Sequence, residues 1–204
     1  MALLDRLAGR GPGRVPIFPL QVVLFPGGVL QLRVFEARYM DMARECLRNA
    51  TPFGVCLIVE GEEVGAPAVP APVGCLARIA GCDMEELGIL KVRAVGTERF
   101  RIVEREVERS GLAVAKVEPI AEEAPAPEAP GLAQCSTWLR RVMSAIDPAR
   151  FGEERRFDDA SWVSFRLAEV LPLRNDVRQR LLELTDATLR IGVLHRFLRQ
   201  QELL

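Results

Sequence analysis

The pattern of hydrophobic and polar residues changes character once along this chain. From about Val15 to Pro119 the apolar residues stand in short runs or alternate with polar ones, as they do in β-strands. From Leu132 onward they recur every three or four residues, which is the spacing of an amphipathic helix. The sequence therefore predicts an α+β protein with a β-rich part followed by a helical part.

The β-rich part contains six or so predicted antiparallel strands. In one of them Leu30, Leu32 and Val34 alternate with polar residues, so that one face of the strand is buried. The predicted strands span residues 15–20, 29–34, 53–60, 73–82, 88–95, 98–107 and 112–119. Because closing a sheet removes its exposed edges, this series favours a small closed or nearly closed barrel.

One predicted helix interrupts the strands. Phe35, Tyr39, Met42 and Cys46 fall at helical spacing and form an apolar stripe, while Arg38 lies off it. We therefore expect Phe35 and Tyr39 to pack against the barrel.

The helical part begins with two predicted helices. The first spans residues 132–146 and ends where an Asp-Pro pair follows. The second spans residues 161–171, with Asp159 placed to cap its N-terminus.

Two further helices complete a predicted bundle. Asp176 and Gln179 are three residues apart, which predicts a capping box at the start of the third helix. The fourth begins at Thr185 or Asp186, and Leu189 is among the residues expected to face inward.

A biased segment separates the two parts. Residues 119–131 contain four prolines, three glutamates and no basic residue, a composition typical of an extended linker. The predicted organisation is a flexible N-terminus at residues 1–13, a β subdomain at 14–119, a linker at 120–131 and a helical subdomain at 132–204.

Composition and charge narrow the class of protein. The 27 basic and 28 acidic side chains nearly cancel, which disfavours a strongly charged nucleic-acid binder. The longest apolar runs, such as residues 53–59, fall far short of the about 20 residues that cross a bilayer. Five irregularly spaced cysteines favour reduced thiols over disulfides. We therefore expect a cytoplasmic protein that does not contact membranes.

The side chains that catalysis requires do not occur at the required spacings. Lys91 and Lys116 lie outside any Gly-Lys-Ser/Thr sequence, so no phosphate-binding loop is predicted, and no serine stands in a Gly-x-Ser-x-Gly turn. His195 is the single histidine, and Cys75 and Cys82 lack the spacing of a zinc site. We therefore predict no catalytic residue, no cofactor and no metal.

Several acidic residues are adjacent in the sequence. Adjacent side chains in an extended segment point apart, which does not favour a shared acid–base site. We therefore expect these pairs to lie on the solvated surface: Glu62-Glu63, Glu85-Glu86, Glu122-Glu123 and Asp158-Asp159.

The segment PIFPLQVVLFPGGVLQLRVFEARY, residues 16–39, resembles the substrate-binding N-terminal domain of the Lon ATP-dependent proteases. Residues 164–194 are similar to the helical extension of that family, with its Leu-Pro-Leu break. The resemblance covers residues 14–195. The matching positions in the first segment are Pro19, Leu20, Leu24, Phe25, Pro26, Leu32, Phe35, Glu36, Arg38 and Tyr39.

The resemblance implies a PUA-like β-barrel followed by a helical bundle, with recognition of polypeptides as its function. Lon proteases continue into an ATPase module and a peptidase module with a serine–lysine pair, and this sequence reaches Leu204 without either. We therefore expect a stand-alone, non-enzymatic version that binds unfolded or damaged polypeptides. It would act alone or as an adaptor in protein quality control, with a protease or a chaperone as a further partner.

The candidate binding residues are Phe25, Pro26, Arg38 and Tyr39. Phe25 and Pro26 belong to a predicted Phe-Pro-Gly-Gly turn, and the proline-bearing loop at residues 62–72 adds a second exposed segment. An exposed apolar surface or a strand edge is what an unfolded segment would recognise. The alternative interpretation is that the helix residues only pack the barrel and hold the helix start.

Two other functions stay open at this point. A PUA-like fold also serves RNA binding elsewhere, although the near-neutral charge and the few aromatic residues disfavour it here. A small-molecule enzyme could use a cleft between barrel and bundle, because a fold does not determine a function, but no motif supports it.

Overall fold

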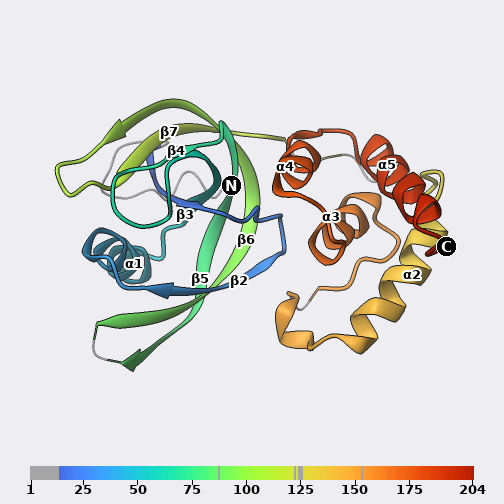
Figure 1. Ribbon diagram of the computed structural model, residues 1–204, viewed down its shortest axis with the longest axis horizontal. Helices are drawn as coiled ribbons and strands as arrows, with labels where there is room; N and C mark the ends of the chain where they lie inside the picture. The colour runs from blue at the N-terminus through green and yellow to red at the C-terminus, as the bar shows by residue number, and fades with distance from the viewer. Residues whose placement is uncertain (1–13, 87, 122, 124–125, 153) are drawn as a thin grey trace.

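The computed structural model describes residues 14–86, 88–121, 123, 126–152 and 154–204. Figure 1 shows a strand-rich body at one end of the molecule and a group of helices at the other. The strand-rich body, which we call the barrel, contains β1 (Arg14–Leu20), β2 (Val29–Val34), α1 (Ala37–Asn49), β3 (Phe53–Glu60), β4 (Val69–Pro70), β5 (Val73–Glu86), β6 (Ile89–Val107) and β7 (Ala113–Pro119). The helices, which we call the bundle, are α2 (Leu132–Ala145), a short 3-10 helix (Pro148–Arg150), α3 (Ala160–Val170), α4 (Asn175–Glu183) and α5 (Ala187–Gln200).

The sheet closes on itself. Its strands follow the order β1, β7, β6, β5 and β3, and β3 then pairs with β1 to complete the ring. The closing pair is parallel, with Ile17 beside Gly54, whereas the other pairs are antiparallel. The α+β class with a mostly antiparallel sheet is therefore confirmed, with one parallel pair that the sequence analysis did not predict.

Two of the predicted strands are one strand. β6 runs for 19 residues without a break and replaces the predicted strands at 88–95 and 98–107. Gly96 lies at their junction, where its N–H donates to Gly28 O at 2.8 Å and its carbonyl accepts from Gly27 N at 2.9 Å. These bonds to the β1–β2 connection hold the backbone extended through the glycine.

The helix α1 begins later than predicted. It starts at Ala37, so Phe35 precedes the helix and its side chain is 53% exposed. Tyr39, Met42 and Cys46 are buried as expected. Arg38 is buried as well. The predictions that Phe35 packs in the core and that Arg38 lies off the buried face were therefore wrong.

The bundle and part of the barrel share one hydrophobic core. Val23, Phe25 and Val73 of the barrel belong to the same cluster as the inward residues of α2 to α5. The N-cap of α3 is confirmed, because the Asp159 carboxylate accepts a hydrogen bond from Ser161 N at 2.8 Å.

The last two helices differ from the sequence prediction at single residues. The N-cap of α4 is Arg174, and the predicted capping box is absent because Asp176 pairs with Arg174. Asp186 caps α5 as predicted, but Leu189 is half-exposed and not inward.

Residues from the predicted linker contribute to packing. Ile120 and Ala126 lie against the bundle core, and Ala129 is buried in it. The predicted flexible segment 1–13 lies outside the described residues. Among the described residues no helix combines the length and the apolar character needed to cross a bilayer.

Candidate functional site

The predicted Phe25–Gly28 turn lies at the junction of barrel and bundle. Phe25 is fully buried and packs against Phe165 of α3, with the ring centroids 5.5 Å apart. The carbonyl of Pro26 accepts a hydrogen bond from Arg166 Nη2 at 2.7 Å. Phe25 is thus not on the exposed turn that the sequence suggested.

Arg38 and Tyr39 lie elsewhere, at the start of α1. The Arg38 guanidinium donates to Gly111 O at 3.1 Å and to the Glu36 carboxylate at 2.9 Å. The Tyr39 ring stacks on Phe18 at 4.2 Å, and burial raises the pKa of its hydroxyl. Tyr39 and Phe25 belong to separate core clusters, so the structure does not bring the four predicted residues into one site.

Three exposed apolar side chains occur on segments that are joined near the start of α1. Two hydrogen bonds tie the loop at residues 61–68 to the segments around the start of α1, from Gln21 N to Glu63 Oε1 and from Gly65 N to Glu36 Oε2. Each of the three joined segments carries one exposed apolar residue that is next in sequence to a residue making one of these bonds. We call these side chains the α1-start surface: Val22 at 40% exposure, Phe35 at 53% and Val64 at 53%.

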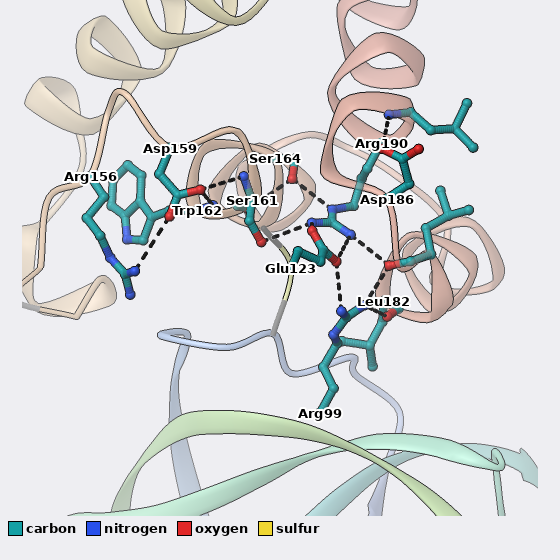
Figure 2. A network of polar contacts seen from close by, with 12 residues as sticks. Arg99, Glu123, Arg156, Asp159, Ser161, Trp162, Ser164, Leu182, Asp186 and Arg190 are labelled. Carbon is teal, nitrogen blue, oxygen red and sulfur yellow. Dashed lines mark hydrogen bonds and ion pairs between the residues drawn. The ribbon is translucent and has the colours of Figure 1, made fainter. Parts of the chain in front are cut away.

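A buried network of charges connects barrel and bundle (Figure 2). Glu123 accepts hydrogen bonds from Arg99 of β6 at 2.7 Å and from both terminal nitrogens of Arg190 of α5, at 2.8 and 2.6 Å. All three side chains are at most 4% exposed. Burial lowers the pKa of Arg99, and the charge of Glu123 opposes that effect. One carboxylate between two guanidiniums therefore holds three distant parts of the chain together.

The two arginines also donate to uncharged groups. Arg99 donates to the carbonyls of Leu182 and Leu184, which end α4. Arg190 donates from Nε to Ser164 Oγ at 2.8 Å. Because the carbonyl end of a helix carries partial negative charge, α4 offsets part of the net positive charge of this network.

A second ion pair lies under the Phe25–Gly28 turn, with the Arg166 side chain 1% exposed and the Glu169 side chain 20% exposed. Arg166 donates to Glu169 Oε1 at 2.8 Å, and burial raises the pKa of the Glu169 carboxyl to about 7 despite the opposing charges of Arg166 and Arg178. Gly28 makes this contact possible, since a Cβ there would lie 2.3 Å from Glu169 Oε1.

Sequence reasoning missed this network for a specific reason. Glu123 was assigned to a solvated acidic pair in a linker, and the structure corrects this, because its side chain is 4% exposed. Glu122, its sequence neighbour, lies outside the described residues. A single sequence gives no signal that pairs a linker glutamate with arginines 24 and 67 positions away.

The described residues offer little reactive chemistry. Burial raises the pKa of the Cys75 thiol to about 12 and that of Cys135 to about 11, so both stay protonated near neutral pH. His195 lies on α5 and contacts Gln134 of α2 at 2.5 Å. No three potential metal ligands cluster among the residues that the structure describes. A hollow of ≈ 380 Å³ lies over α2, away from the barrel, and is lined by Trp138, Arg141 and the last two leucines among others.

Comparison with solved structures identifies similar folds. The Lon N-terminal domain protein from Xanthomonas campestris is 37% identical, with a TM-score of 0.75, over 89% of this chain and 96% of that one. The N-terminal domain of a Mycobacterium avium complex Lon protease has a TM-score of 0.65 over 89% and 95% of the two chains, and at 18% identity it supports the fold alone.

Curated relatives match a shorter stretch. Cereblon from Gallus gallus is 28% identical over 147 residues, 70% of this chain, and cereblon from Xenopus tropicalis is 30% identical over 113 residues, 53% of this chain. The chain spans only about a third or less of the length of these relatives, 32% and 24%. The sequence model of the ATP-dependent protease La (LON) substrate-binding domain, however, matches residues 14–200. The chain therefore belongs to the LON substrate-binding domain family.

Proposed function

We propose that this protein binds unfolded or damaged polypeptide segments, alone or as an adaptor for a protease or a chaperone. The observation that carries the proposal is the family match over residues 14–200, because that family is described by substrate binding. The Lon N-terminal domain protein at 37% identity and similar fold supports the same assignment.

The α1-start surface is the part of the barrel that we assign to binding. Phe35 and Val64 expose about half of each side chain, and an unfolded segment can cover such apolar area only where it is not already packed. Arg38 and Tyr39 are buried at the start of α1, where Arg38 donates to Gly111 O and the Tyr39 ring stacks on Phe18. Phe25 and Pro26 hold the barrel against the bundle. In this proposal they do not contact the bound polypeptide.

The experiment compares two matched variants. Fluorescence anisotropy would measure binding of labelled, reduced and carboxymethylated lactalbumin to the wild-type protein, to Phe35→Ser and to Leu189→Ser. Both substitutions remove a half-exposed apolar side chain, but Leu189 lies on α5 in the bundle. We expect Phe35→Ser to weaken binding by about fivefold or more, as loss of an apolar contact residue does, and Leu189→Ser to leave binding unchanged.

Two results would contradict the proposal. If the wild-type protein at high micromolar concentration does not bind the denatured lactalbumin, the proposed function is contradicted. If Phe35→Ser and Leu189→Ser change the affinity equally, the assignment of binding to the α1-start surface is contradicted.

The two alternatives gain no specific support. A small-molecule enzyme needs space between barrel and bundle, and the described residues of that junction are packed around Phe25 and Glu123. RNA binding would require the basic side chains to act together on one face, and the near-neutral net charge does not favour it.

A further inference from the structure

One strand of the barrel has a partner on one side only. β2 pairs with β6 over its whole length, from Val29 beside Val95 to Val34 beside Leu90. Within the part of the chain that the structure describes, no other strand pairs with β2. The backbone N–H and C=O groups along its second edge are therefore available to an added strand.

The two faces of β2 differ in chemistry. Leu30 and Leu32 point to the core side, where they pack against the cluster beneath α1 and stay partly exposed. Gln31 and Arg33 alternate with them and are exposed on the outer face. A strand added to this edge would place alternate side chains beside leucines and beside an arginine.

Positive charge gathers on the outer face behind the edge. Arg33 lies directly opposite Lys91, Gln31 lies opposite Arg93, and Arg78 of β5 continues the face beyond Val95. Asp83 lies opposite Lys91 and places an acidic residue in this row. Among the described residues, Arg33, Arg78 and Arg93 form no ion pair. The positive charges at these three positions are therefore not neutralised by an acidic partner within the described part of the chain.

We propose that the free edge of β2 binds an extended polypeptide segment in which apolar and acidic residues alternate. This inference rests on the proposed function and names the class of segment. The apolar side chains of the segment lie beside Leu30 and Leu32, and the acidic side chains lie beside Gln31 and Arg33, with Arg93 behind Gln31. A second copy of this chain is disfavoured at the edge, because it would bring like charges together.

The first experiment varies the peptide and leaves the protein unchanged. Anisotropy would compare labelled ten-residue peptides of alternating Val and Glu, and of alternating Val and Lys. We expect the acidic peptide to bind at least about tenfold more tightly, and added salt to reduce the difference. Equal affinity of the two peptides would overturn the proposal.

Backbone methylation tests strand addition directly. Alternate N–H groups of an extended peptide point to opposite edges, so only one set can pair with β2. The Val-Glu peptide would be methylated on the nitrogens of every valine in one version and of every glutamate in the other. We expect one version to lose binding and the other to retain it; two unaffected versions would contradict pairing at an edge.

A pair of protein variants locates the site. Arg33→Glu reverses an exposed charge on β2, and Arg196→Glu makes the same change on α5 in the bundle. Exposed ion pairs are weak, so we expect Arg33→Glu to reduce affinity for the Val-Glu peptide by about fivefold, with Arg196→Glu unchanged. An equal loss in both variants would contradict the assignment to β2.

Two further measurements separate this inference from the proposed function. If denatured lactalbumin binds Arg33→Glu as well as wild type and the Val-Glu peptide does not bind either protein, the edge proposal fails and the proposed function stands. If the Val-Glu peptide binds as predicted and denatured lactalbumin does not, the edge proposal stands and the proposed function fails. Binding of a labelled uridine decamer that depends on Arg33, without peptide binding, would overturn the edge proposal in favour of RNA.

Discussion

The side chain of Glu123 lies between two buried arginines that belong to different parts of the chain, Arg99 of β6 and Arg190 of α5. A buried charge without its partner is costly, because the protein interior replaces little of the lost hydration. The position of this one residue therefore decides whether the two arginines are stabilising or destabilising.

Substitution Glu123→Gln should destabilise the protein strongly. It removes the carboxylate and leaves two like charges buried together, a change that costs about 3–5 kcal/mol in comparable buried pairs. Urea unfolding followed by circular dichroism would measure the free energy of unfolding. Glu118→Gln, at an exposed position on β7, is the control. Equal stability of the two variants would contradict the role of Glu123.

Glu169 predicts a specific dependence of stability on pH. Its pKa is raised to about 7 in the folded protein, above the value near 4.3 of an unperturbed glutamate. The folded state therefore binds this proton more tightly than the unfolded state, and the resulting stabilisation is present at pH 4 and lost as pH rises through 7. Relative to Glu169→Gln, the wild-type protein should lose about 1–3 kcal/mol of unfolding free energy between pH 4.5 and 8.

Urea titrations of both proteins across that range test this prediction. The difference between wild type and Glu169→Gln isolates this carboxyl from the other titrating groups. A difference that is constant with pH, or that grows in favour of wild type as pH rises, would contradict the raised pKa.

Elements predicted from periodicity agree with the structure where contacts are local. The strand at residues 53–60 and the helix after Asp159 are found where periodicity and capping predict them. The prediction failed where a distant partner decides the outcome. Arg38 is buried because it reaches Gly111, 73 positions away, and Gln179 donates to Val73 of the barrel instead of forming a capping box.

The candidate site was predictable only in part, for the same reason. The motif around Phe35 to Tyr39 lies at the end of the barrel that we propose for binding, but the helix begins two residues after Phe35, which exposes that ring. Phe25 stood in a turn sequence, and its burial depends on Phe165, which a local pattern does not contain. The free edge of β2 depends on the order of the strands, which alternation alone does not give.

The closure of the barrel depends on two glycines in neighbouring strands. A Cβ at either Gly54 of β3 or Gly74 of β5 would lie 2.7 Å from Phe100 Cζ, so the buried ring fills space that only glycine leaves open. Gly54→Ala should cost about 1–3 kcal/mol by overpacking. Gly81→Ala is the matched control in β5, because its Cβ would meet its nearest neighbour at 3.8 Å.

Thermal and urea unfolding of the two alanine variants would measure the difference. Gly54→Ala combined with Phe100→Leu should recover part of the loss, because the smaller side chain vacates the contact. Equal stability of Gly54→Ala and Gly81→Ala would contradict this account of the closure.

At the scale of the whole molecule, the shared core and the Glu123 network join barrel and bundle. The proposed boundary at residues 120–131 therefore separates two kinds of structure that we expect to unfold together. Both tryptophans, Trp138 and Trp162, belong to the bundle and report its unfolding, while labelling of the buried thiols of Cys56 and Cys75 reports the barrel. Coincident transitions in urea are the expected result, and two separated transitions would contradict joint unfolding.

We propose that the barrel binds unfolded polypeptide at the start of α1 and along β2. Amide hydrogen exchange of the protein, with and without saturating denatured lactalbumin, tests it most directly because it maps where the polypeptide lies. We expect added protection at Val22, at residues 29–39 and at residues 61–68, and none on α5. Protection confined to the bundle, or no change in exchange at any residue, would contradict it.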